Sequence, residues 1–140
     1  MTTSSGAVPE GPRAVVAGHA HFASALIDAV GRISGRADSL RAVSNDGLDA
    51  AGVEAAIRQA LATQRAHVVF TDLPAGSCTM AARRVARTEP DLAIVTGASV
   101  GMLLDFVLGG GDTVEDLQRA AARARDAMVV LPPSGMPRGH

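Results

Sequence analysis

The sequence predicts an α/β domain built on a single doubly wound, mainly parallel sheet with helices on both faces. Two observations predict this fold class. Short β-branched apolar runs alternate along the chain with segments in which apolar residues recur at helical spacing. Aromatic residues make up only 2% of the chain, so the core must consist of small aliphatic side chains, as is typical of helices packed on a parallel sheet.

The expected strands are four short apolar runs, over residues 13–18, 40–44, 67–72 and 92–97. The intervening segments carry apolar residues at helical spacing. They predict helices over about residues 23–33, 53–61 and 79–88. Four strand–helix units in succession imply right-handed crossovers and favour the strand order 2-1-3-4.

The C-terminal third predicts two more helices and a last strand. Ser99 can cap a helix over residues 100–108, which is apolar nearly all round, so the rest of the domain or a second subunit should cover it. After a glycine break, TVED resembles a capping box and opens a final helix. The run MVVL, residues 128–131, predicts a short C-terminal edge strand, formed within the domain or across subunits.

We expect one folded domain over residues 13–131, with flexible tails over residues 1–12 and 132–140. The start of the chain lacks the basic and apolar segments of a secretion signal, and no apolar run reaches membrane-spanning length. A single cysteine, Cys78, excludes an internal disulfide. The sequence therefore predicts a cytoplasmic protein.

Composition also excludes several classes of function. The net charge of −1 and the absence of Trp and Tyr argue against nucleic-acid binding. All thirteen basic side chains are Arg, which excludes a phosphate loop or Schiff base that requires Lys. No cofactor is expected.

Polar residues at the ends of the predicted strands form the candidate site. In the order 2-1-3-4 the first and third strands are neighbours, so His19 should face Asp72, with the segment Thr96 to Ser99 nearby. A histidine beside a carboxylate suits general base catalysis or nucleophilic attack by the imidazole. The turn PAGSC could hold an anion, since Gly76 admits close approach and Ser77 adds a hydroxyl to the N–H groups of the next helix.

Each of these residues has a simpler interpretation. His19 could be a solvated loop residue, Asp72 a turn cap, and Ser77 a plain helix cap. A zinc site formed by His19, His21, Asp72 and Cys78 is a further alternative, which we rank well below the histidine–carboxylate site.

Three segments, VVAGHAHFASAL, HVVFTDLPAGSCTMAA and LAIVTGASVGMLLDFVL, together resemble the IIA components of the mannose/fructose/N-acetylgalactosamine-type sugar phosphotransferase system (PTS). The first resembles that family's GHGGFASG, which implies phosphorylation on His19. The second resembles TDLLGGTPF, which implies that Asp72 orients the histidine and that Gly76 and Ser77 bind phosphate. The third resembles VITGTNLQLLLEMVL, where the family forms a loop near the site and a dimer interface.

Three departures from the family segments matter for the site. His21 stands at a usual Gly, Ala75 at the first Gly of the turn, and Cys78 at a Pro. Ala75 would be strained only if that position needs a positive φ. His21 and Ser99 are candidate accessory residues of the site.

The resemblance implies that the chain is a homodimeric phosphocarrier. It would accept a phosphoryl group from the small histidine phosphocarrier protein HPr and pass it to a IIB component of a sugar permease. Two alternatives stay open: a regulatory PTS-type phosphoprotein without sugar transport, and a non-transferring ligand- or metal-binding module of the same fold.

Overall fold

Four parallel strands form the sheet, in the order β2-β1-β3-β4, which confirms the predicted order. The computed structural model describes residues 12–64 and 66–135. Apart from residue 12, the predicted N-terminal tail lies outside these residues, as do residues 136–140 of the C-terminal tail. The strands are β1 (Ala14–Gly18), β2 (Leu40–Ser44), β3 (Val68–Thr71) and β4 (Ala93–Val95).

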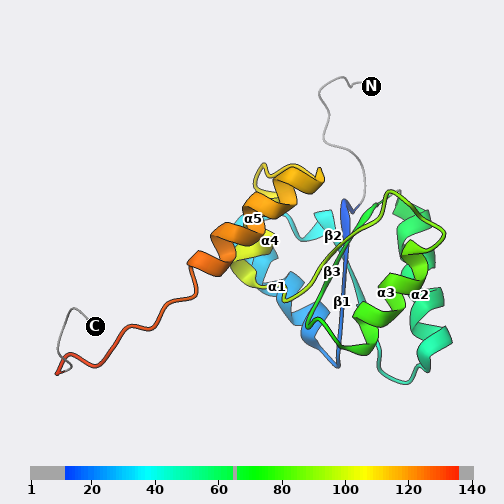
Figure 1. Ribbon diagram of the computed structural model, residues 1–140, viewed down its shortest axis with the longest axis horizontal. Coiled ribbons are helices and arrows are strands. Elements are labelled where there is room, and N and C mark those ends of the chain that lie inside the picture. Colours follow the sequence, from blue (N-terminus) through cyan, green and yellow to red (C-terminus); the bar gives the residue numbers. More distant parts are fainter. Residues whose placement is uncertain (1–11, 65, 136–140) are drawn as a thin grey trace.

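The helices cover both faces of the sheet, as Figure 1 shows. On one face lie α1 (Phe22–Ser34), α4 (Val100–Val107) and α5 (Val114–Asp126). On the other lie α2 (Ala50–Gln64) and α3 (Ser77–Ala86). A short 3-10 turn, η1 (Ala37–Ser39), precedes β2. No helix within the described residues is both long and apolar enough to cross a membrane.

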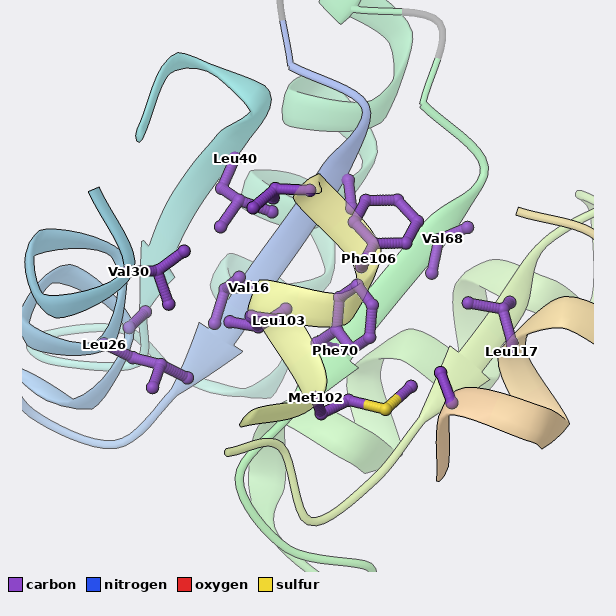
Figure 2. Close-up of a cluster of buried hydrophobic side chains, with 14 residues drawn as sticks. Val16, Leu26, Val30, Leu40, Val68, Phe70, Met102, Leu103, Phe106 and Leu117 are labelled. Carbon is purple, nitrogen blue, oxygen red and sulfur yellow. The ribbon is translucent and has the colours of Figure 1, made fainter. Parts of the chain in front are cut away.

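Alternate residues of the two central strands point into two separate cores, because successive side chains of a strand face opposite sides of the sheet. Val16 and Phe70 pack with α1, α4 and α5, the core drawn in Figure 2. Val15 and Val69 pack with α2 and α3 on the other face. All four side chains are fully buried, so β1 and β3 supply the shared wall of both cores.

The apolar helix α4 is covered by the same chain. Met102, Leu103 and Phe106 are buried between the sheet, α1 and α5, and the ring of Phe106 meets that of Phe70 edge-on at 5.2 Å. The sequence allowed this helix to be covered by the domain or by a second subunit, and the domain covers most of its apolar surface. Leu108, the residue after α4, is strongly exposed. Ser99 caps α4 as predicted, since its Oγ accepts from the Met102 N–H at 3.2 Å.

The predicted C-terminal edge strand is wrong for the single chain. Residues 128–131 form no strand, and Figure 1 shows the segment after α5 running away from the sheet. Met128, Val129, Val130 and Leu131 are 67–88% exposed. A high β-propensity means that these side chains pack well on a half-buried sheet. It does not produce a strand where no neighbouring strand pairs with the segment.

Arg13, just before β1, ties the sheet to the far end of α4. Its guanidinium donates to the Phe106 carbonyl at 3.0 Å and to the Gly110 carbonyl at 2.9 Å, and it lies 4.3 Å from the centre of the Phe106 ring. The last carbonyls of a helix have no partner within the helix. One arm of the planar guanidinium satisfies the Phe106 carbonyl at the end of α4, and the other binds the loop that follows.

We predict that Arg13→Met lowers the free energy of unfolding by about 1–3 kcal/mol, because two partly buried carbonyls lose their donor. Arg13→Lys should recover only part of the loss, since an ammonium cannot reproduce the two-armed geometry. Urea unfolding measures the effect. Arg32→Met is the matched control: Arg32 forms an exposed pair with Asp28 within α1 and should change stability by less than about 0.5 kcal/mol. Equal losses of unfolding free energy in the two Met variants would contradict a stabilising role for the Arg13 contacts.

Candidate functional site

His19 follows the last residue of β1, in a turn that leads directly into α1. The His19 carbonyl accepts from the Phe22 N–H at 2.9 Å, which closes the turn. Because β1 and β3 are parallel neighbours, their carboxyl ends lie at the same edge of the sheet. The structure therefore brings His19 to Asp72, the residue after β3, as the strand order predicts.

Asp72 binds His19 through both its ring and its backbone. One carboxylate oxygen, Oδ2, lies 2.6 Å from His19 Nδ1 and accepts from the His19 N–H at 2.8 Å. The other, Oδ1, accepts from the Leu73 N–H at 3.0 Å. A carboxylate only accepts, so Nδ1 carries the proton, and in the neutral ring the lone pair is on Nε2. The Asp72 side chain is 7% exposed and that of His19 is 47% exposed. The buried carboxylate therefore orients the imidazole, and the rest of the ring is accessible to solvent and to partner proteins.

Opposing effects act on the Asp72 carboxyl. Burial alone would raise its pKa, but the hydrogen bonds from the His19 ring and N–H outweigh burial and lower the pKa below its ordinary value. Asp72 is therefore an anion at neutral pH and a fixed acceptor for Nδ1–H. The interpretation of Asp72 as a plain turn cap accounts only for its contact with Leu73.

Gly18 makes this close approach sterically possible. A Cβ on Gly18 would lie 2.5 Å from Phe22 Cδ2 and 3.2 Å from Asp72 Oδ2. Real Cβ atoms do not come that close to a ring carbon, so any side chain would push apart the turn, the ring and the carboxylate. The glycine that ends β1 is thus part of the site.

The turn after β3 places the start of α3 beside the imidazole. A Cβ on Gly76 would lie 3.1 Å from His19 Cε1, the carbon between the two ring nitrogens, so Nε2 is within one bond of this contact. Gly76 is the N-cap of α3 in extended conformation, and no side chain of the described residues accepts from the first N–H groups of the helix. The first N–H groups of α3 are therefore available to an anion bound at Nε2. Thr79 braces the turn, since its hydroxyl donates to the Leu73 carbonyl at 2.6 Å.

Ser77 is the first residue of α3 and does not act as its cap. Its Oγ accepts from Asn45 Nδ2 at 3.2 Å. Cys78, the next residue, is fully buried in the core beneath α3. Burial, with a smaller contribution from the Asp72 charge, raises the pKa of the Cys78 thiol. Cys78 therefore packs in the core as a neutral thiol, and among the described residues no cluster of three or more His, Cys, Asp and Glu could hold a metal ion.

The three departures from the family segments differ in consequence. Ala75 needs no positive φ, because within the described chain Ala20 is the single non-glycine residue with positive φ. His21 occupies the N-cap position of α1 and is exposed; its carbonyl accepts from the Ala25 N–H, and no hydrogen bond of the described residues joins its ring to His19 or Asp72. The accessory roles of His21 and Ser99 stay predictions.

Two features of the site were missed by sequence reasoning. Ala20 adopts φ 51°, a conformation that glycine adopts easily and alanine does not. The resembling segment GHGGFASG carries Gly at this position, so the mismatch indicated a strained backbone. Ser44, the last residue of the edge strand β2, and Asn45, which follows it, bind both peptide groups of Ala20. Ser44 Oγ donates to the carbonyl at 2.9 Å, and Asn45 Oδ1 accepts from the N–H at 3.3 Å. A polar loop gives no sequence signal of such long-range contacts.

Comparisons with known proteins bear on the family and the fold of the chain. Residues 13–121 match the family model of the PTS system fructose IIA component. The structure is similar to a PTS IIA protein associated with the fucose utilization operon from Streptococcus pneumoniae, with a TM-score of 0.76 and 19% identity over 89% of this chain and 96% of that one.

Two further solved structures have the same fold. The mannose/sorbose-specific IIA subunit from Enterococcus faecalis gives a TM-score of 0.74 and 16% identity over 91% of this chain and 99% of that one. A phosphotransferase system component EIIA from Streptococcus agalactiae gives a TM-score of 0.72 and 19% identity over 84% and 95%. No curated protein matches the sequence.

We predict that Ala20→Gly stabilises the domain by about 1 kcal/mol, because glycine adopts positive φ without the steric cost that alanine meets at φ 51°. Thermal or urea unfolding measures the change. Ala25→Gly is the matched control: Ala25 is exposed within α1, where the same substitution should destabilise by about 1 kcal/mol. A loss of stability in both variants would show that the turn is not strained at Ala20.

Proposed function

The chain belongs to the family of PTS system fructose IIA components, and on this premise we propose that it carries a phosphoryl group on His19 between two partner proteins. Family and fold make it a phosphotransfer component. The finer proposal is carried by one observation: Asp72 holds Nδ1 of His19 at 2.6 Å, which leaves Nε2 free beside the uncapped start of α3.

In the proposed step, the Nε2 lone pair attacks phosphorus of a phosphohistidine on HPr. The P–Nε2 bond forms as the donor's P–N bond breaks, and that bond's electron pair returns to the donor imidazole. The Nδ1 proton stays in the hydrogen bond to Asp72, whose negative charge stabilises the positive charge that develops on the ring. The reverse geometry, with a histidine of a IIB component as acceptor, passes the group onward.

Backbone N–H groups of α3 and the Ser77 hydroxyl are the proposed donors to the phosphoryl oxygens. Gly76 keeps the space above His19 Cε1 open, which a side chain would fill. Because these donors are neutral, the site stabilises a phosphoryl group moderately, as transfer in both directions requires. With His19 about half exposed, a partner can reach the phosphorus in line. Both partners would meet the domain in the cytoplasm.

We also propose that the domain is a homodimer. Residues 128–131 present a continuous run of exposed apolar side chains, and β4 pairs with β3 alone in the described sheet. A second copy that pairs with this segment would cover its side chains and satisfy its backbone.

Incubation with phosphoenolpyruvate, Enzyme I and HPr should add the mass of one phosphoryl group to the protein, and mild acid should remove it. His19→Gln should not be labelled, whereas His21→Gln, a matched substitution in the same turn, should be labelled. Asp72→Asn should fold but accept the group about 10- to 100-fold more slowly, because the charged hydrogen bond to Nδ1 is lost. Acid-labile label on His19→Gln would refute the assignment.

Sedimentation at micromolar concentration should show a dimer that Val130→Asp converts to a monomer, since a charge inserted in an apolar interface is costly to bury. Val130 is 88% exposed in the single chain, so the substitution should leave the fold of the monomer intact. Ile33→Asp, at an exposed position of α1, is the control and should remain dimeric. A monomeric wild-type protein would contradict the proposal.

A further inference from the structure

We propose that Asn45 is a positioning residue of the phosphorylation site, which joins the His19 turn to the first turn of α3 and leaves the Ser77 hydroxyl proton for a phosphoryl oxygen. The inference rests on the proposed function and adds to it a residue from the edge strand's loop. Asn45 is neither adjacent to His19 in sequence nor part of the segments that resemble the family.

Asn45 contacts three segments that meet at the carboxyl edge of the sheet. Its backbone N–H donates to the Gly18 carbonyl at 3.3 Å, at the end of β1. Its side chain accepts from the Ala20 N–H at 3.3 Å and donates to Ser77 Oγ at 3.2 Å. One side chain therefore fixes the spacing between the turn that carries the imidazole and the helix end proposed to bind phosphate.

The chemistry of these contacts fixes the orientation of the amide. The Ala20 N–H can only donate, so the atom that faces it must be Oδ1, and the atom that faces Ser77 must be the donor Nδ2. Ser77 Oγ is then an acceptor toward Asn45, and its single proton points elsewhere. A phosphoryl oxygen at the adjacent Nε2 would be a strong acceptor for this proton.

The same amide supports the strained turn. Ala20 holds φ 51° while Asn45 binds its N–H and Ser44 its carbonyl. Without these bonds the turn would relax toward conformations that alanine prefers, and the His19 backbone, one residue earlier, would move with it. Asn45 thus positions Nε2 of His19 by holding the turn, and it orients the Ser77 hydroxyl toward the phosphoryl oxygens.

The test is a double-mutant cycle in the assay with phosphoenolpyruvate, Enzyme I and HPr. Asn45→Ala and Ser77→Ala should each slow phosphorylation about tenfold, and the double variant should be far less impaired than the product of the two effects. Asp46→Ala, an exposed neighbour in the same loop, is the control and should match the wild type. Independent, multiplicative effects, or a wild-type rate in Asn45→Ala, would overturn the inference and leave the phosphocarrier function standing.

Asn45→Asp separates positioning from a structural role. Aspartate keeps the acceptor for the Ala20 N–H but turns the donor to Ser77 into an acceptor, which would capture the Ser77 proton. We expect Asn45→Asp to be slower than Asn45→Ala, although it unfolds at a higher urea concentration. If Asn45 only supported the turn, Asn45→Asp would be the faster of the two, and the inference would be wrong.

If the wild type accepts no phosphoryl group, the proposed function is refuted. A binding measurement still tests the role of Asn45 in that case. Titration with inorganic phosphate should shift the backbone amide resonances of Gly76 and Ser77 in NMR spectra. In Asn45→Ala the dissociation constant should rise severalfold, while Asp46→Ala should bind as the wild type does. Equal affinity in Asn45→Ala and the wild type would overturn the role of Asn45 whatever the transfer assay shows.

Discussion

The parallel pairing of β1 with β3 is the constraint on which the site depends. Its register joins Val15 to Val69 and Ala17 to Thr71, so the next step along the two strands sets Gly18 against Asp72. The missing side chain of Gly18 then admits the carboxylate, which reaches both the N–H and the ring of His19. The connection from β1 to β3 passes through α1, β2 and α2 and not through a hairpin, so the two strands run parallel and their carboxyl ends meet at one edge.

The charges at the site explain how a phosphoryl group could be held without being trapped. Asp72 is an anion, and it would repel a phosphoryl group on the far side of the imidazole while stabilising the positive ring. The neutral donors of α3 would offset that repulsion in part. Cys78, which lies directly beneath in the core, adds no charge because burial keeps its thiol protonated. In the proposed phosphocarrier, this balance would let the group leave as readily as it arrives.

The sequence was informative wherever a signal is local. Apolar periodicity predicted the strands and most helices, and the residues at the strand ends predicted the contact of His19 with Asp72. Helix α3 begins at Ser77, two residues before the first residue expected, because its cap is Gly76, which leaves no side-chain signature. The strand expected over residues 128–131 failed because pairing depends on a partner strand, and propensity does not supply one.

Contacts that join distant parts of the chain were beyond such reasoning. Arg13 binds carbonyls 93 and 97 residues away, and Asn45 bonds to Ser77 across 32 residues. Only the assembled tertiary structure defines these pairs, since neither spacing nor composition distinguishes these side chains from solvated ones. Ala20 is an intermediate case: its strain follows from its φ, and a comparison with the glycine of the family segment would have indicated it.

The four core residues of β1, Ala14 to Ala17, are two alanines and two valines, all fully buried. Each face of the sheet receives one alanine and one valine from it. A slip of β1 by one residue would exchange the two faces, and each face would still receive one alanine and one valine, so these four residues alone discriminate weakly between the registers. The flanking residues oppose the slip. In one direction Arg13 would occupy the buried position of Ala14, and in either direction a side chain, from Ala17 or His19, would reach the position of Gly18, where a Cβ would lie 2.5 Å from Phe22 Cδ2. The absent Cβ that admits Asp72 to His19 therefore also helps to fix the register of β1, so one glycine serves both the geometry of the site and the alignment of the central strand.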